Sequence, residues 1–115
     1  MTLTLYGIPN CDTVRKARRW LDGNGIRHAF HDLRGEGLER DVLERWADRA
    51  GWQSLLNTRS TTFRTLGDKE RVVTDRGAAM EAMLQHPTLI KRPVAERGET
   101  VLVGFNASEW ENALC

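Results

Sequence analysis

The chain has 115 residues, a formal net charge of +1 and 40% hydrophobic residues, values typical of a single folded domain. The balanced charge argues against direct binding of nucleic acid or of an anionic membrane surface. No apolar stretch approaches the ~18 residues of a membrane span, and the residues after Met1 lack the pattern of a secretory signal. Two cysteines are too few for a disulfide scaffold or a four-ligand zinc site. We therefore expect a cytoplasmic, monomeric protein that binds neither membranes nor nucleic acid.

The first third of the sequence predicts a strand, a helix and a second strand. Residues 2–6 alternate between polar and apolar side chains, as a strand does. After the break at 7–10, apolar residues recur at helical spacing, and Asn10 is the expected N-cap. Residues 26–32 alternate again. This order predicts a βαβ unit whose two strands run parallel.

The middle of the chain predicts helices, and its end predicts a hairpin followed by a helix. A helix that ends at Gly51 is predicted by four apolar residues at every fourth position: Leu38, Val42, Trp46 and Ala50. The polar stretch 57–62 is typical of a loop, and a further helix is expected over 78–85. Residues 93–96 and 100–103 are β-prone runs around a glycine, which predicts a hairpin. Asn106 is placed to cap the last helix.

Cys11 stands at the predicted start of the first helix. The unpaired N–H groups and partial positive charge of a helix N-terminus favour the thiolate over the thiol, and Arg15 adds a cation one turn away. These features indicate a nucleophile, whereas a small buried filler is the ordinary role of a free cysteine. The motif is not C-x-x-C, and Cys115, at the opposite terminus, is interpreted as incidental.

Other polar residues give weaker signals. His28 and His31 are three apart on a predicted strand, where side chains alternate between faces, so we expect no metal site. Fourteen of the 17 basic residues are arginines, whose planar fork suits carboxylates and oxyanions. Arg59 lies in the hydroxyl-rich stretch and Arg92 directly precedes Pro93, so each is either an anion ligand or a solvated surface residue.

Four segments in register, 6–17, 56–59, 89–93 and 102–105, resemble the ArsC/Spx family and most of all its YffB-type subgroup. The resemblance spans essentially the whole chain. It implies an α/β fold of the thioredoxin-like, glutaredoxin type, with order βαβ then ββα. It also implies one domain over 1–115 with a helical insertion at approximately 35–88. Pro93 would be a cis proline facing Cys11.

The resemblance also bears on activity. In glutaredoxin-coupled arsenate reductases of the family, the matching cysteine attacks arsenate and three arginines hold the oxyanion. Arg59 and Arg92 match two of them, but Phe105 and its neighbours supply no third, and Asp12 places a carboxylate where an arsenate site has glycine. Fixed negative charge repels an incoming oxyanion. Spx regulators usually carry C-x-x-C, which is absent here.

The sequence therefore predicts a glutathione-dependent thiol reductase. The alternatives are a Spx-like regulator that binds RNA polymerase without turnover and, third, an arsenate reductase coupled to glutaredoxin. Cys11 would be the catalytic nucleophile, with no tightly bound cofactor and with glutathione as co-substrate. Glutathione or another small thiol or disulfide, and glutaredoxin, are the expected partners. Seven residues are predicted to bind substrate or anion: Asn10, Asp12, Thr13, Arg15, Arg59, Arg92 and Pro93.

Overall fold

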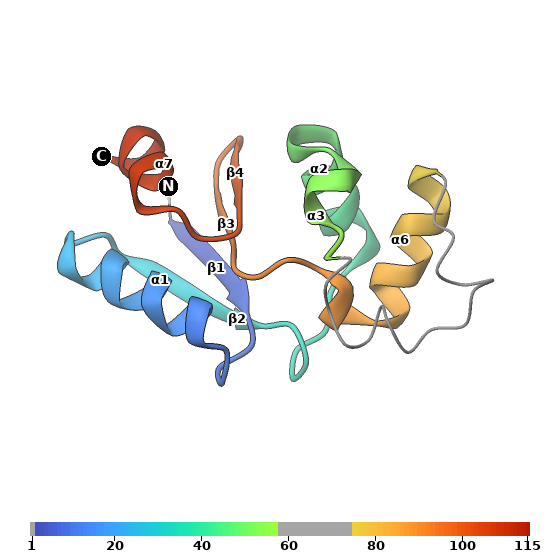
Figure 1. The fold of residues 1–115 in the computed structure, drawn as a ribbon, viewed down its shortest axis with the longest axis horizontal. Helices are drawn as coiled ribbons and strands as arrows, with labels where there is room; N and C mark the ends of the chain where they lie inside the picture. The colour runs from blue at the N-terminus through green and yellow to red at the C-terminus, as the bar shows by residue number, and fades with distance from the viewer. Residues whose placement is uncertain (1, 58–74) are drawn as a thin grey trace. The chain divides into compact units, whose positions relative to one another are not determined.

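A computed structural model describes residues 2–57 and 75–115, and the chain divides into two compact units. The first unit combines both ends of the chain, Met1–Glu36 and Arg92–Cys115. The second unit is the intervening segment, Gly37–Lys91. Each unit has its own elements, drawn in Figure 1.

The first unit contains a four-stranded sheet in the order β2-β1-β3-β4. Its strands are β1 (Leu3–Gly7), β2 (His28–Asp32), β3 (Val94–Arg97) and β4 (Thr100–Val103). The central strand β1 runs parallel to β2 and antiparallel to β3, and β3 pairs antiparallel with β4. The predicted βαβ unit and the predicted hairpin are both confirmed.

Helices α1 (Asp12–Gly23) and α7 (Ala107–Leu114) pack against a common core with this sheet. Strand side chains alternate between faces, and Leu3 and Leu5 point into this core. Full burial of one such side chain contributes roughly 1.5–3 kcal/mol. The buried members are Leu3, Leu5, Val14, Ala17, Leu21, Ala95, Leu102, Trp110 and Leu114. Asn106 caps α7 as predicted, because its side chain accepts a hydrogen bond from the Glu109 N–H at 3.0 Å.

The second unit is helical in its described part. It contains α2 (Arg40–Ala50), the short α3 (Trp52–Leu55), α6 (Arg76–Gln85) and the 3₁₀ turn η1 (Pro87–Leu89). The helices expected before Gly51 and over 78–85 are present, but α3 was not predicted. Gly51 ends α2 with a φ of 86°, a left-handed conformation that glycine adopts without strain.

The buried face of α2 does not coincide with the four apolar residues whose spacing predicted the helix. Leu43, Trp46 and Ala47 are buried, whereas Val42 is half-buried and Leu38 precedes the helix. A helix turns about 100° per residue, so positions four apart drift around its axis, and a core face needs spacings of both three and four. The spacing of four therefore predicted the helix correctly but did not identify its buried face.

Hydrogen bonds and ion pairs join the elements of the second unit. Asp75 caps α6 by accepting the Ala78 N–H at 2.8 Å. Arg76 pairs with Asp48 at 2.7 Å, and Arg40 pairs with Glu81, so both pairs link α2 to α6. Within the described residues, no helix is both long enough and apolar enough to cross a membrane.

Candidate active site

Cys11 occupies the N-cap of α1, directly after the loop that leaves β1. Its backbone is extended, with φ −95° and ψ 126°. The Cys11 N–H donates to the Ile8 carbonyl at 3.1 Å, and the Cys11 carbonyl accepts the Arg15 N–H at 3.0 Å as the first bond of the helix. The prediction that Asn10 is the N-cap was therefore wrong by one residue. Asn10 instead lies in a tight turn closed by the bond from Cys11 to Ile8.

The cysteine side chain is half-buried and packs against the core of the first unit. The N-terminal N–H groups of a helix have no partners within the helix and carry a partial positive charge. A thiolate at the N-cap is therefore beside the groups that stabilise negative charge. The structure confirms that Cys11 stands at the start of α1, and its role as a nucleophile stays a prediction.

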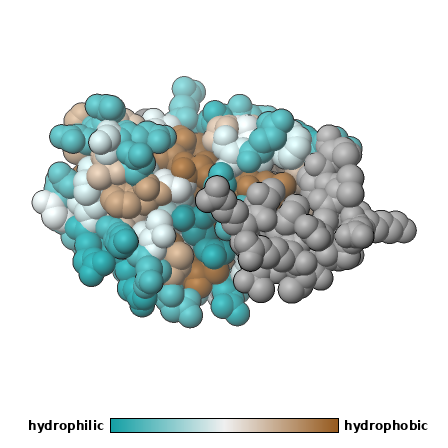
Figure 2. Space-filling model, viewed as in Figure 1, coloured by the Kyte–Doolittle hydropathy of each residue, from teal (hydrophilic) through white to brown (hydrophobic). Residues whose placement is uncertain are grey.

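Asp12 and Arg15 form an ion pair on the exposed side of α1. A hydrogen bond from Arg15, together with its charge, lowers the pKa of Asp12 below the ordinary value. Thr13 between them is exposed. In Figure 2 hydrophilic side chains cover the outward side of α1. The Arg15 guanidinium, expected near the sulfur, is thus engaged with Asp12.

Arg92 and Pro93 lie at the same end of the sheet as Cys11. Tyr6, near the end of β1, pairs with Val94, so the residues that precede β3 meet the loop that follows β1. The Arg92–Pro93 peptide bond is cis, as the resemblance implied, and Pro93 is buried. Arg92 is half-buried. We call this end of the sheet, where β1, β2 and β4 finish and β3 starts, the site end.

Two other residues singled out from the sequence, Arg59 and Cys115, are not located at the site end by the structure. Arg59 falls outside the described residues, so its place in the site stays a prediction. Cys115 is exposed at the end of α7. In the described ranges, no group of three or more histidine, cysteine or acidic side chains is placed to hold a metal ion.

Phe105 follows β4 at the site end but belongs to an aromatic cluster. Its ring lies 5.0 Å from Trp110 and 6.2 Å from Trp20, both in edge-on geometry. The Trp110 indole N–H donates to the Gly104 carbonyl at 3.1 Å, and the Gly104 N–H donates to the Pro93 carbonyl at 2.8 Å. The cluster therefore supports the turn beside the cis proline.

A hollow beside the cysteine loop was not predicted from the sequence. We call it the side hollow; it is lined by Ile8, Pro9, Asn10, Asp32, Arg34 and Gly35. The register of β1 and β2 pairs Gly7 with Asp32, so the segments after both strands meet at the site end. No motif links residues 32–35 to Cys11 in the sequence. Only the parallel pairing of the strands could have indicated it.

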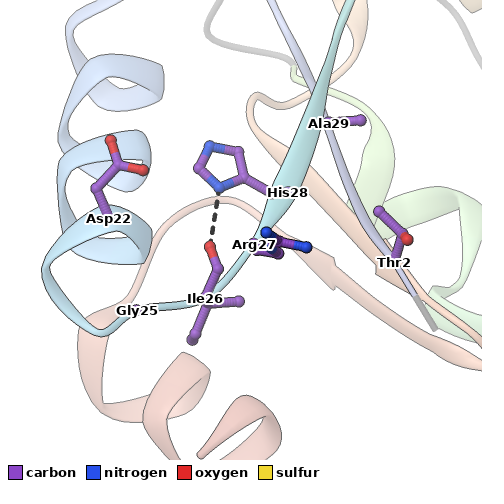
Figure 3. A pocket seen from close by; sticks show the side chains of 7 residues that line it. All are labelled: Thr2, Asp22, Gly25, Ile26, Arg27, His28 and Ala29. Carbon is purple, nitrogen blue, oxygen red and sulfur yellow. Dashed lines mark hydrogen bonds between the residues drawn. The ribbon is translucent and has the colours of Figure 1, made fainter.

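A second hollow lies at the opposite end of the sheet (Figure 3). It is formed where β2 begins, and Asp22 of α1 and His28 of β2 point toward one another there. The His28 Nδ1 lies 3.1 Å from the Ile26 carbonyl. Because Cys11 follows the carboxyl end of β1, this hollow is not part of the cysteine site.

Comparisons with known proteins place the chain among relatives of similar length. The sequence model of the ArsC family matches residues 6–113. A solved structure of a YFFB protein is 45% identical, with a TM-score of 0.95, over 99% of this chain and 100% of that one. An arsenate reductase (ArsC) related protein from Brucella melitensis is also 45% identical, with a TM-score of 0.77, over 97% and 93% of the two chains.

A regulator also matches. The global transcriptional regulator Spx of Streptococcus agalactiae is 28% identical over 110 residues, which cover 93% of this chain and 79% of the regulator. The solved structures confirm the predicted α/β, thioredoxin-like fold.

Proposed function

This chain belongs to the ArsC family, and we propose that it is a glutathione-dependent thiol–disulfide oxidoreductase of the cytoplasm, acting as a monomer with Cys11 as its nucleophile. The observation that carries the proposal is the place of Cys11 at the N-cap of α1, half-buried at the site end. A thiolate is the reactive form of cysteine, and the unpaired N–H groups of a helix N-terminus are of the kind that stabilise negative charge.

The reaction is thiol–disulfide exchange in two steps. The Cys11 thiolate attacks one sulfur of a substrate disulfide, a new S–S bond forms, and the other sulfur leaves as a thiolate. A glutathione thiolate then attacks the mixed disulfide, restores the Cys11 thiolate and carries away the substrate half as a disulfide. Glutathione supplies the electrons as a co-substrate, so no tightly bound cofactor is needed. Glutaredoxin is the expected partner that reduces a Cys11–glutathione disulfide.

The neighbouring residues have distinct roles in this proposal. Arg92, half-buried at the site end, and Arg59 hold the carboxylates of glutathione, because charge-assisted arginine–carboxylate bonds are strong and directional. The N–H groups that follow Asn10 face the negative charge at sulfur. Pro93, which follows a cis peptide bond, faces Cys11 in this proposal, as in the family that the sequence resembles. Asp12 holds Arg15, so the Arg15 charge acts on Cys11 only in part.

The direct test is intact-mass spectrometry after incubation with oxidised glutathione. We expect a single glutathione adduct on Cys11. The Cys11→Ser variant should form none there and have no reductase activity, whereas the matched Cys115→Ser variant should keep most of both. An adduct confined to Cys115, or full activity of Cys11→Ser, would contradict the proposal.

A Spx-like regulator is the second candidate, favoured by the similarity to Spx over 93% of this chain. Such a protein would bind RNA polymerase and would not turn over a disulfide. Pull-down of polymerase by the purified chain, compared with the coupled reductase assay, separates the two. Arsenate reduction is a third candidate, supported by the similarity to the arsenate reductase related protein from Brucella melitensis. Against it, this chain has Phe105 after β4 and supplies no third arginine there for the oxyanion.

A further inference from the structure

The side hollow is formed by a turn with fixed geometry. Asp32 accepts the Arg34 N–H at 3.0 Å, and the Glu36 carboxylate accepts the Asp32 N–H at 2.9 Å. The Leu33 N–H donates to the Gly7 carbonyl at 2.9 Å, which fastens the turn to the end of β1. Residues 32–36 are therefore held by both backbone and side-chain bonds.

The turn leaves the hollow open and places opposite charges at its wall. A Cβ on Gly35 would lie 2.9 Å from Asp32 Oδ2, so a larger residue would crowd this carboxylate. Arg34 is exposed, and within residues 2–57 and 75–115 its guanidinium has no ion pair. The space, about 380 Å³, thus has a half-buried carboxylate and an exposed guanidinium on one wall.

The opposite wall is the loop that leads into the cysteine. Asn10 lines the hollow and Cys11 is the next residue. Consecutive Cα atoms are only about 3.8 Å apart. A group bound in the side hollow therefore contacts the residue that directly precedes Cys11 in the chain.

We propose that the side hollow binds the α-ammonium and α-carboxylate groups of an amino-acid thiol whose disulfide Cys11 attacks. Arg34 pairs with the carboxylate and Asp32 with the ammonium, so the hollow matches this head group in charge. The inference rests on the proposed function of Cys11 and specifies its substrate class. The head group is either that of cysteine or the γ-glutamyl end of glutathione, which have the same pair of charges. In the second case Arg92 and Arg59 bind the glycine carboxylate of glutathione.

Binding of the head group in the side hollow leaves the chemical reaction an ordinary thiol–disulfide exchange. The Cys11 thiolate bonds to one sulfur of the disulfide and the second sulfur leaves as the free thiolate, so one disulfide is exchanged for another. The substrate half that stays on Cys11 is the half held in the hollow. A reducing thiol, glutathione in the proposed function, then releases it.

The experiment measures the rate at which Cys11 of the full chain forms a mixed disulfide, followed by intact mass. Glutathione disulfide and cystine carry both charges, and bis(2-hydroxyethyl) disulfide carries neither. We expect Arg34→Gln and Asp32→Asn to slow the first two reagents by about two- to fivefold, as for exposed charge pairs, and to leave the neutral reagent unchanged. Asparagine keeps an oxygen to accept the Arg34 N–H. Arg27→Gln, an exposed arginine at the other end of β2, is the matched control and should change nothing.

Equal slowing of the neutral and charged reagents, or no slowing of either, would overturn the proposal. A binding measurement makes the test independent of cysteine chemistry. In the Cys11→Ser variant, S-methylglutathione and S-methylcysteine should shift the Gly35 amide resonance. The ligand whose shift saturates at the lower concentration shows whether the hollow prefers the γ-glutamyl head group or that of cysteine. If Cys11 forms no adduct but these shifts occur, the proposed function fails and the site stands. If Cys11 reacts but the thioethers cause no shift at Gly35, the site fails and the proposed function stands.

Discussion

Replacing Phe105 by Leu separates the aromatic contacts beside the candidate site from the apolar volume that the side chain fills. Phe105 meets Trp110 and Trp20 edge-on, with ring centroids 5.0 and 6.2 Å apart. Each such pair contributes about 0.5–1.5 kcal/mol beyond area burial. Leucine retains most of the buried volume but neither ring contact. We therefore expect the free energy of unfolding to fall by about 1–3 kcal/mol.

Urea unfolding followed by circular dichroism measures this loss. For a protein of this size the free energy falls by about 2 kcal/mol per molar urea, so the midpoint should drop by roughly 0.5–1.5 M. Phe30→Leu is the control, because Phe30 is also half-buried and its ring has the Arg18 guanidinium at 4.6 Å. That contact accounts for about 0.5–1 kcal/mol. A Phe105→Leu loss no larger than that of Phe30→Leu would refute the role assigned to the cluster.

The same geometry predicts the result of placing an arginine after β4. Phe105→Arg would move a charge into a half-buried aromatic cluster beside the Pro93–Gly104 hydrogen bond. Burial of an unpaired charge costs more than the loss of ring contacts. We expect a larger loss of stability than for Leu and no gain in arsenate turnover with glutathione and glutaredoxin. A gain in turnover would show that the substituted side chain reaches the anion site.

Three further predictions concern the start of α1. Iodoacetamide should alkylate Cys11 faster than Cys115 below pH 7, and equal rates would contradict activation by the helix N-terminus. Asp12→Asn should speed this alkylation by roughly two- to fivefold, because it removes a charge beside the sulfur. The pKa of Asp12 is lowered by Arg15, so its carboxylate is charged throughout pH 5 to 8. An unchanged alkylation rate in Asp12→Asn would argue against a charge effect. Gly7→Ala should lower the free energy of unfolding by about 1–3 kcal/mol, since its Cβ would lie 2.7 Å from Val14 Cγ2. Gly23→Ala is the control, because a Cβ there meets no atom within 4 Å. Similar losses for the two variants in urea unfolding would contradict the crowding at Gly7.

Local patterns were enough to predict the sheet and its flanking helices. Alternation over 2–6 and 26–32 gave the strands β1 and β2, and helical spacing between them gave the crossover α1, whose parallel geometry follows from chain connectivity. Asn106 was correctly identified as a cap, because a short polar side chain before an apolar period is a specific signal. Cys11 was placed at a helix start by the same kind of pattern.

The failures came where the decisive contact is tertiary or a matter of one residue. Asn10 has the side chain of an N-cap, but it lies in the turn closed by the bond from the Cys11 N–H to Ile8, and the first helical bond runs from the Arg15 N–H to the Cys11 carbonyl. The four-residue α3 is too short for periodicity to reveal. Asp32 and Arg34 are distant from Cys11 in sequence, and only the strand register makes them neighbours of its loop.

The pairing of Asp12 with Arg15 determines which groups are left to stabilise a thiolate at position 11. An arginine one turn after the cysteine looks, from the sequence, like its counter-ion. In the structure the carboxylate at the first helical position accepts a hydrogen bond from that guanidinium, so the two charges compensate each other on the exposed side of α1. Stabilisation of the sulfur then rests on the N–H groups of the first turn, which are fixed by the fold and keep their polarity at every pH. Because Arg15→Gln alone would leave the Asp12 carboxylate uncompensated, the test is the double variant Asp12→Asn, Arg15→Gln, which removes the ion pair as a unit. An unchanged alkylation profile in this variant would bear the argument out, and a profile moved toward that of Cys115 would return the role to Arg15.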